Sequence, residues 1–235
     1  MWLARLDDPR SKPEQVLQMR GVARDLRWSP DGTHVAFVSD RTDHSFLALY
    51  SVASGSVLYL DPSTDLDSSP VWSPDSRHIS FLRVPHDRNS LLFEPHRTAL
   101  PWTIRVVEVT TGKPHEVWRA AEGAGSAFHQ TDSQDQLHWT ADDQIAFPWE
   151  RDGWLHLFAV PTSGGAATLL TPGNFEVEHT SLSDDRKTLV FDSNQNDIDR
   201  RHAWRISFAA DGSHQASEAV TMGDGIETQP VISAL

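Results

Sequence analysis

The chain has 235 residues, no cysteine, and a formal net charge of −13 that comes from 20 Lys and Arg against 33 Asp and Glu. This length allows one large domain or two small ones with a sizeable core. The lack of cysteine excludes disulfides, thiolate zinc sites and cysteine nucleophiles, and the acidic balance without a basic patch argues against nucleic acid and anionic membranes as partners.

The start of the chain, MWLARLDDPRSKPEQ, has neither the basic beginning nor the apolar core of a signal peptide. No window approaches the roughly 18 apolar residues that a membrane span needs. We therefore expect a soluble chain, and the sequence leaves its compartment open between cytoplasm and periplasm.

A marker sequence recurs along the chain. The run LRWSPDG at 26–32 returns as PVWSPDS at 70–76, as LHWTADD at 137–143 and as TSLSDDR at 180–186. After each marker, two apolar residues stand two positions apart, which places both on one face of an extended strand, with polar neighbours expected on the other face. These pairs are Val35 and Phe37, Ile79 and Phe81, Ile145 and Phe147, and Leu189 and Phe191.

Two further strands complete each unit. A third run ends at a glycine turn, at Gly55, Gly112, Gly165 and Gly212, and a short fourth run follows each turn. Four strands at a period of about 44 residues predict an all-β fold, a β-propeller of four-stranded antiparallel blades. The expected boundaries are a lead-in at 1–20, blades at 21–66, 67–133, 134–177 and 178–227, and the start of another blade at 228–235.

The second unit is longer than the others because it carries two insertions, VPHDRNSLLFEPHRTALP at 84–101 and AAEGAGSAFHQTDSQD at 120–135. At the other end, QPVISAL at 229–235 repeats SPVWSPD at 69–75. We expect four blades and the first strand of a fifth, a partial propeller. A fragment of a larger ring is favoured over a closed four-bladed ring, since an unfinished blade exposes a sheet edge.

The acidic residues of the markers could be functional groups of a site or residues that form turns. They are Asp31, Asp75, Asp142, Asp143, Asp184 and Asp185. A Pro-Asp-Gly or Asp-Asp step between two strands is typical of a turn, in which the Asp carboxylate caps backbone N–H groups. We interpret these acids as turn residues.

Catalytic and metal sites have no recognisable motif here. The twelve histidines stand apart without metal-ligand spacing, and NQNDIDRR at 194–201 lacks the pattern of a calcium loop. No Gly-x-Ser-x-Gly elbow occurs. We expect no catalytic residue, no metal and no cofactor in this chain.

Two stretches are candidates for binding. In FPWERDGWLHLFAVP at 147–161, Glu150 and Arg151 stand between two tryptophans, where they could grip a peptide terminus. The structural alternative is a hairpin turn with a Glu150–Arg151 ion pair and tryptophans packed between blades. In LLTPGNFEVEHTSLS, Glu176 and Glu178 share a strand face and form a similar carboxylate pair.

Three blocks carry a family resemblance: WSPDG with AFVSD, then WERDGWLHLFAVP with GGAATLLTPGNFEVEH, and SLSDDRKTLVFDSNQNDIDRRHAWRI. They resemble the N-terminal propeller of prolyl oligopeptidase-family serine peptidases, closest to the bacterial dipeptidyl peptidase IV-like branch. The resemblance implies a larger enzyme with an α/β-hydrolase domain that holds a Ser-Asp-His triad. The helix-borne Glu pair that binds the substrate amine in dipeptidyl peptidases has no counterpart motif in this chain.

The resemblance implies a non-catalytic propeller that gates and positions peptide substrates for a hydrolase domain outside this chain. Arg88, Glu94 and Arg97 in the first insertion are candidates for contact with that domain or its substrate. The competing interpretation is a stand-alone TolB-like propeller that binds a protein or peptide, and a propeller glycosidase with two carboxylates is a third. The sequence leaves a homo-oligomer open.

Overall fold

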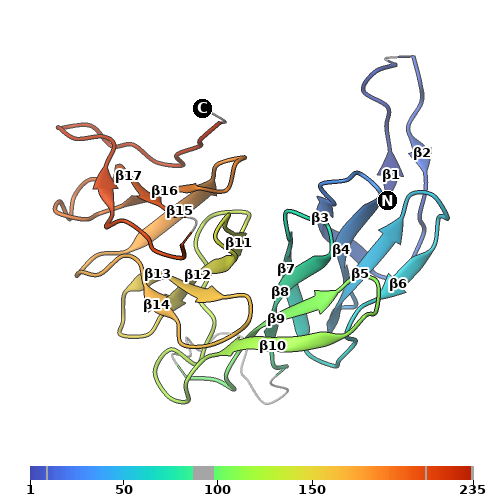
Figure 1. The fold of residues 1–235 in the computed structure, drawn as a ribbon, viewed down its shortest axis with the longest axis horizontal. Helices are drawn as coiled ribbons and strands as arrows, with labels where there is room; N and C mark the ends of the chain where they lie inside the picture. Colours follow the sequence, from blue (N-terminus) through green and yellow to red (C-terminus); the bar gives the residue numbers. More distant parts are fainter. Residues whose placement is uncertain (9, 87–97, 210, 234–235) are drawn as a thin grey trace.

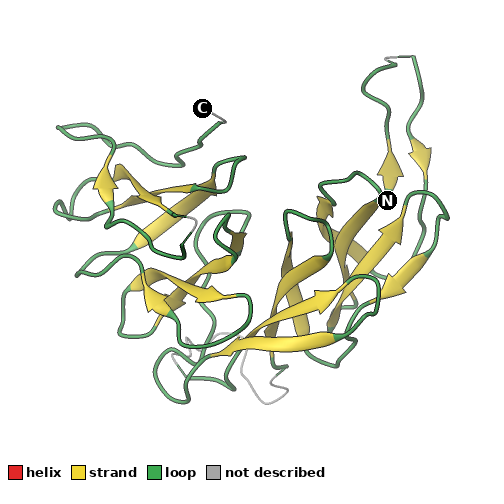
Figure 2. Cartoon of the chain, viewed as in Figure 1, coloured by secondary structure: helices red, strands yellow, loops and turns green. Residues whose placement is uncertain are grey.

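The computed structural model describes residues 1–8, 10–86, 98–209 and 211–233. Within these ranges the chain forms strands and no helix, which confirms the all-β prediction (Figure 2). The described residues accordingly contain no helix long and apolar enough to cross a bilayer.

Four four-stranded units follow a short hairpin along the chain, and each unit is antiparallel (Figure 1). The hairpin consists of β1 (Trp2–Leu3) and β2 (Glu14–Gln15). The first blade is β3 (Val22–Trp28), β4 (His34–Asp40), β5 (Ser45–Ser51) and β6 (Val57–Tyr59). The second is β7 (Leu66–Trp72), β8 (His78–Val84), β9 (Thr103–Glu108) and β10 (Pro114–Arg119). The third is β11 (His138–Trp139), β12 (Gln144–Glu150), β13 (Leu155–Pro161) and β14 (Thr168–Leu169). The fourth is β15 (Val177–Leu182), β16 (Thr188–Ser193), β17 (His202–Ser207) and β18 (Glu218–Ala219).

The blades form an open arc, and the first strand of each blade, β3, β7, β11 or β15, faces its concave side (Figure 1). One parallel pairing, Ser45 with Leu66, joins the first two blades into a single eight-stranded sheet. The predicted partial propeller is confirmed. At the end of the described chain, Gln229 (φ 56°) is left-handed like Ser69 (φ 54°), its equivalent in the second blade. The described residues 228–233 form no strand, so the predicted first strand of a fifth blade is not formed there.

The marker acids are turn residues, as predicted. Asp31 accepts hydrogen bonds from the Ser29 hydroxyl (2.6 Å) and the Thr33 N–H (3.0 Å), and the bond from Ser29 is the main cause that lowers the Asp31 pKa to about 2. In the fourth blade the equivalent residue is Asp185, which accepts from Ser183 and from the Lys187 N–H. These carboxylates are engaged in holding the turn between the first and second strands.

The second strand of each blade is buried on both faces, which corrects the expectation of a polar outer face. Phe37, Phe81, Phe147 and Phe191 have no exposed surface, and neither have Ala36, Ser80, Leu82, Ala146 and Asp192 on the opposite faces. Neighbouring blades cover the inner faces, and the N-terminal segment covers the first blade, where Met1, Val16, Leu17 and Met19 pack against the cluster that contains Val35 and Phe37. The strands in the middle of a blade therefore lose contact with water on both sides. This burial of apolar surface is the main source of stability for the fold.

The marker tryptophan of one blade bonds to the blade before it. The Trp72 Nε1–H donates to the carbonyl of Arg27 at 3.0 Å, and Trp72 is 3% exposed. Trp28, its equivalent in the first blade, is 52% exposed. The difference follows from position, because the described chain places no preceding blade against β3.

A network of charges also ties the first two blades together. The buried Asp67 carboxylate pairs with Arg83 (2.7 Å) and accepts from the Leu47 N–H, while Arg83 and Arg105 both pair with Asp61. Burial raises the pKa of Asp67, and the Arg83 guanidinium partly offsets that effect. Asp67 therefore bridges β5 of the first blade and β8 of the second.

Candidate functional site

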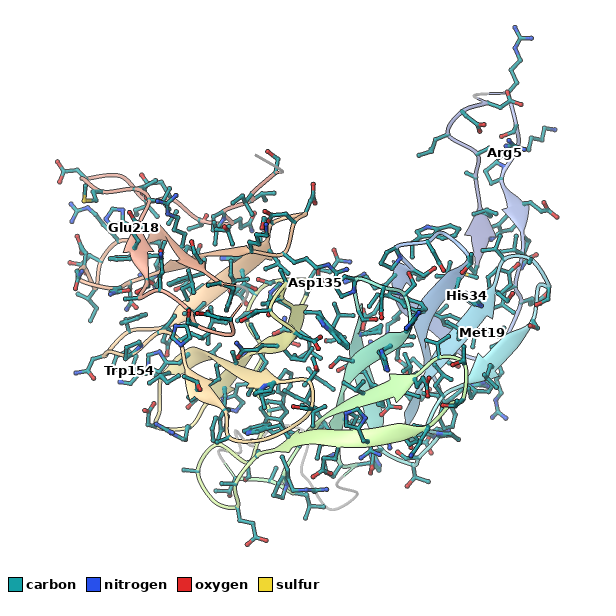
Figure 3. The ribbon with its side chains drawn as sticks, viewed as in Figure 1. Arg5, Met19, His34, Asp135, Trp154 and Glu218 are labelled. Carbon is teal, nitrogen blue, oxygen red and sulfur yellow. The ribbon has the colours of Figure 1, made fainter. Side chains whose placement is uncertain are left out.

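The insertion at 120–135 connects three blades. From Gly125 onward it contacts the third blade, then the fourth, and ends at the first, where Asp135 forms an ion pair with Arg27. Figure 3 shows Asp135 between the first two blades and the last two. A segment without strands thus lines a cavity at the rim and a larger one on the concave side, and its last residue, Asp135, also lines a smaller cavity beside Trp72 and Arg27.

The first of these, which we call the rim pocket, has a volume of about 150 Å³. Its walls are formed by the insertion and by the loop between β12 and β13, with His129, Glu150, Arg151 and Asp152 among the lining residues. His129 Nδ1 bonds to the Glu150 carboxylate. Glu150 is therefore paired with His129, which corrects the alternative of a Glu150–Arg151 ion pair.

Aromatic side chains hold Arg151 at the rim pocket. Its guanidinium lies over the ring of Trp149 (5.6 Å) and over the ring of Phe158 (5.5 Å), an arrangement that favours a cation. Trp149 also packs against Trp118 of the second blade at 4.8 Å. Trp149 therefore lies between two blades and leaves the charged end of Arg151 at the surface.

Gly125 fixes the insertion against this hairpin. Its φ is +82°, and a Cβ at this position would lie 2.8 Å from Trp149 Nε1 and 2.9 Å from both Arg151 Cα and the Glu150 carbonyl oxygen. The carbonyl of Gly125 accepts from the buried Trp149 Nε1–H at 2.8 Å. A larger residue would require a shift of the hairpin backbone, so the position favours glycine.

The second cavity, which we call the central pocket, has a volume of about 690 Å³. It lies among the first strands of the second, third and fourth blades and includes Asp132 to Asp135 of the insertion. The insertion covers the free edge of β15, because the Asp132 N–H donates to the Glu178 carbonyl (2.8 Å) and the Thr180 N–H donates to the Ser133 hydroxyl (2.6 Å). Further polar lining comes from the first strands and the marker turn: His138, His179, Thr180, Ser181, Ser183, Asp184, Arg186 and, from the end of the described chain, Gln229.

His138 is a neutral member of the central pocket. Burial lowers the pKa of its imidazole to about 4, so at pH 7 the ring is uncharged. Its Nε2 lies 2.9 Å from the Thr180 hydroxyl on β15. The ring thus contributes hydrogen bonding without charge.

Of the two predicted glutamates, Glu178 is the second residue of β15 and Glu176 immediately precedes the strand, and they alternate with the buried Phe175 and Val177. Glu176 is exposed and its N–H donates to the Asn194 side chain at 2.8 Å. Glu178 pairs with Arg201 at 2.5 Å, so its charge is neutralised by a residue of the same blade. Of this pair, Glu176 is the one with an exposed carboxylate.

Glu178, His179 and Asp192 have ligand atoms close enough together to hold a metal ion. All three are already engaged. Glu178 pairs with Arg201, while Asp192 accepts from the His179 and Gln229 N–H groups and lies 3.0 Å from His179 Nδ1. The bonds and the nearby guanidinium satisfy this cluster as part of the fold.

The structure brings Glu150 and Arg151 together at the rim pocket and places Glu176 and Glu178 on the neighbouring blade. Arg88 and Arg97, with Glu94, lie outside the described residues. Sequence reasoning missed His129, Asp132 and Arg186 as lining residues. The length of the second insertion was the available signal, because inserted segments on a repeat often form a binding face.

Residues 96–233 match the family described as "Dipeptidyl peptidase IV (DPP IV) N-terminal region". The chain belongs to the dipeptidyl peptidase IV N-terminal region family. This match covers more than half of the chain and includes the last two strands of the second blade, the insertion at 120–135, the rim pocket and the lining of the central pocket except Val71. It confirms the resemblance on which the prediction of function depended.

Solved structures share the fold of this dipeptidyl peptidase IV N-terminal region at low identity. TolB from Acinetobacter baumannii is similar over 92% of the chain and 48% of its own length (TM-score 0.59, 17% identity). A putative dipeptidyl aminopeptidase IV from Bacteroides ovatus is similar over 80% of the chain and 35% of its own (TM-score 0.55, 15% identity). A puromycin-hydrolyzing peptidase from Mycobacterium tuberculosis is similar over 85% and 32% (TM-score 0.58, 18% identity). The chain thus spans half or less of the length of each.

Proposed function

We propose that this chain is the non-catalytic propeller of a serine peptidase, where it admits and positions peptide substrates for an α/β-hydrolase domain that lies outside the sequence. Membership of the family supports the parent class, since relatives of this fold include peptidases. The observation that carries the proposal is the insertion at 120–135, which lines both the rim pocket and the central pocket.

The chemistry of the two pockets fits a peptide. The rim pocket offers a carboxylate, a guanidinium held on aromatic rings and an imidazole, and these groups can bind the charged or amide groups of a peptide. The central pocket combines hydroxyl groups with apolar side chains such as Leu137 and Trp139. A pocket with an apolar lining and a few placed polar groups is typical of a binding site for small ligands.

Peptide binding by this chain tests the proposal directly. We expect a fluorescein-labelled hexapeptide library to bind in fluorescence anisotropy with micromolar to millimolar dissociation constants. Glu150→Gln and Arg151→Gln should each weaken binding about tenfold, as expected for the loss of one charge-assisted hydrogen bond. Glu218→Gln on the distant strand β18 is the matched control and should bind like the wild type; an equal loss in this control contradicts the assignment of the rim pocket.

The chain should perform no serine chemistry by itself, because it contains no Gly-x-Ser-x-Gly elbow. We expect no labelling by a fluorophosphonate probe. Covalent labelling of any serine would refute the non-catalytic role.

A stand-alone propeller that binds a protein partner is the second candidate, because the similarity to TolB extends over 92% of the chain. The coding sequence that follows codon 235 separates the two. A reading frame that continues into a Gly-x-Ser-x-Gly elbow and then Asp and His supports the peptidase, whereas a stop codon after further blades supports the TolB-like protein.

A further inference from the structure

Arg186 occupies an unusual position on the central pocket. It is the fourth residue of the marker turn in the fourth blade, with φ 62°, where the first blade has Gly32. This left-handed conformation disfavours residues with a Cβ. At the equivalent position of the second blade, the Ser76 hydroxyl accepts from the Asp31 N–H, and in the third blade the Asp143 carboxylate accepts from Trp139 Nε1–H.

The Arg186 side chain is longer than those of Ser76 and Asp143 and contacts a blade that is not adjacent in the chain. Its Nη1 donates to the carbonyl of Trp72, which belongs to the second blade, at 2.7 Å. This bond holds the guanidinium at the wall that the central pocket shares with a smaller cavity beside Trp72 and Arg27. The guanidinium is therefore oriented from one side by the protein.

The charge of Arg186 has no carboxylate partner among the described residues. The residue is half-buried, and burial is the cause that lowers its pKa. The other arginines near the concave side are paired: Arg27 with Asp135, Arg83 with Asp67, and Arg201 with Glu178. A guanidinium has five N–H donors in a planar fork that suits a carboxylate, and the Trp72 carbonyl uses one side of it.

The acidic groups of the central pocket do not neutralise Arg186. Asp135 pairs with Arg27, and Asp184, which also lines the pocket, is exposed and forms no ion pair with Arg186 among the described residues. Asp132 lies at the opposite end of β15, since its N–H donates to the carbonyl of Glu178. Four residues of extended strand from Glu178 to Leu182 correspond to about 13 Å, and Arg186 follows beyond that end.

We propose that Arg186 binds the C-terminal carboxylate of a peptide in the central pocket, so that the peptide extends from Arg186 along β15 toward Asp132. The proposal rests on the proposed function and names the end of the substrate that enters the pocket first. Ser181 offers a hydroxyl and Leu182 an apolar side chain along that route.

The test compares tetra-alanine with a free C-terminus against tetra-alanine amide by isothermal titration calorimetry on this chain. We expect the free acid to bind at least about tenfold more tightly, as one charge-assisted bidentate contact predicts. Arg186→Gln should abolish that discrimination. Lys187→Gln, an exposed cation on the same turn, is the matched control and should retain it.

Competition on the wild-type chain keeps the test independent of how the variant folds. Sodium acetate at about 50 mM should weaken binding of the free acid and leave the amide unaffected, compared with sodium chloride at the same ionic strength. Equal affinity for the two peptides overturns the carboxylate site while peptide positioning stands, and retained discrimination in Arg186→Gln overturns the assignment to Arg186. Binding of neither peptide contradicts both proposals.

Discussion

Replacement of Gly125 by alanine should detach the insertion from the rim pocket. The φ of +82° alone costs a residue with a Cβ about 1–2 kcal/mol. In addition, the new Cβ would meet the backbone of Glu150 and Arg151 at 2.9 Å, and relief of that clash separates the Gly125 carbonyl from the buried Trp149 Nε1–H. A buried donor without a partner costs about 1–3 kcal/mol, so the free energy of unfolding should fall by about 2–5 kcal/mol.

Gly123→Ala is the matched control for this prediction. Gly123 has a similar φ of +89°, but a Cβ added there would meet no atom within 4 Å, so this variant should lose only the conformational contribution of about 1–2 kcal/mol. Urea unfolding followed by tryptophan fluorescence measures both. With a slope of about 2 kcal/mol/M, the midpoint should fall by about 0.5–1 M for Gly123→Ala and by about 1–2.5 M for Gly125→Ala. Equal midpoints for the two variants would refute the steric argument.

Three further expectations concern the blades. Trp72→Ala should lower the free energy of unfolding by about 3–5 kcal/mol and Trp28→Ala by less than about 1 kcal/mol, because only Trp72 is buried; similar urea midpoints would contradict this. The His138 ring should titrate near pH 4 when followed by NMR. Because the pKa of the imidazole in the unfolded chain is 6.5, the free energy of unfolding should fall as the pH drops from about 6.5 to 4. A titration midpoint above pH 6 contradicts a neutral ring. The pKa of Asp31 is lowered to about 2 from 3.8, which gives stability that is present above pH 3.8 and lost as the pH falls toward 2. The melting temperature of Asp31→Asn should therefore depend less on pH between 4 and 2 than that of an Asp224→Asn control. An unchanged pH dependence argues against the Ser29–Asp31 bond.

Local patterns predicted much of the fold because a propeller repeats one unit. The marker turn is formed by residues within five positions of one another, as in the bonds from Ser29 and Thr33 to Asp31. Alternation placed Phe37 and its equivalents in the core correctly. The prediction of a polar outer face was wrong, because burial of that face depends on what packs against the blade, whereas the pattern of a strand describes only one blade.

The candidate site was harder to predict than the fold. Glu150 and Arg151 were recognised from their aromatic neighbours, but the partner of Glu150 is His129, which lies 21 residues earlier in an insertion without periodicity. Arg186 looked like an ordinary turn residue, and its bond to Trp72 spans 114 positions. Contacts at such separations depend on how the blades curve around the concave side.

The number of blades in this chain, their strand order and the turns between the first two strands could be predicted from local patterns, because each depends on hydrogen bonds and side-chain alternation within one repeat. Which charges are satisfied and which pockets exist became known from the folded chain. Asp135 pairs with Arg27, Glu178 pairs with Arg201, and, among the residues that the structure describes, Arg186 is left facing the central pocket without a carboxylate. These outcomes depend on the packing of one blade against others, which brings together residues that no local pattern relates.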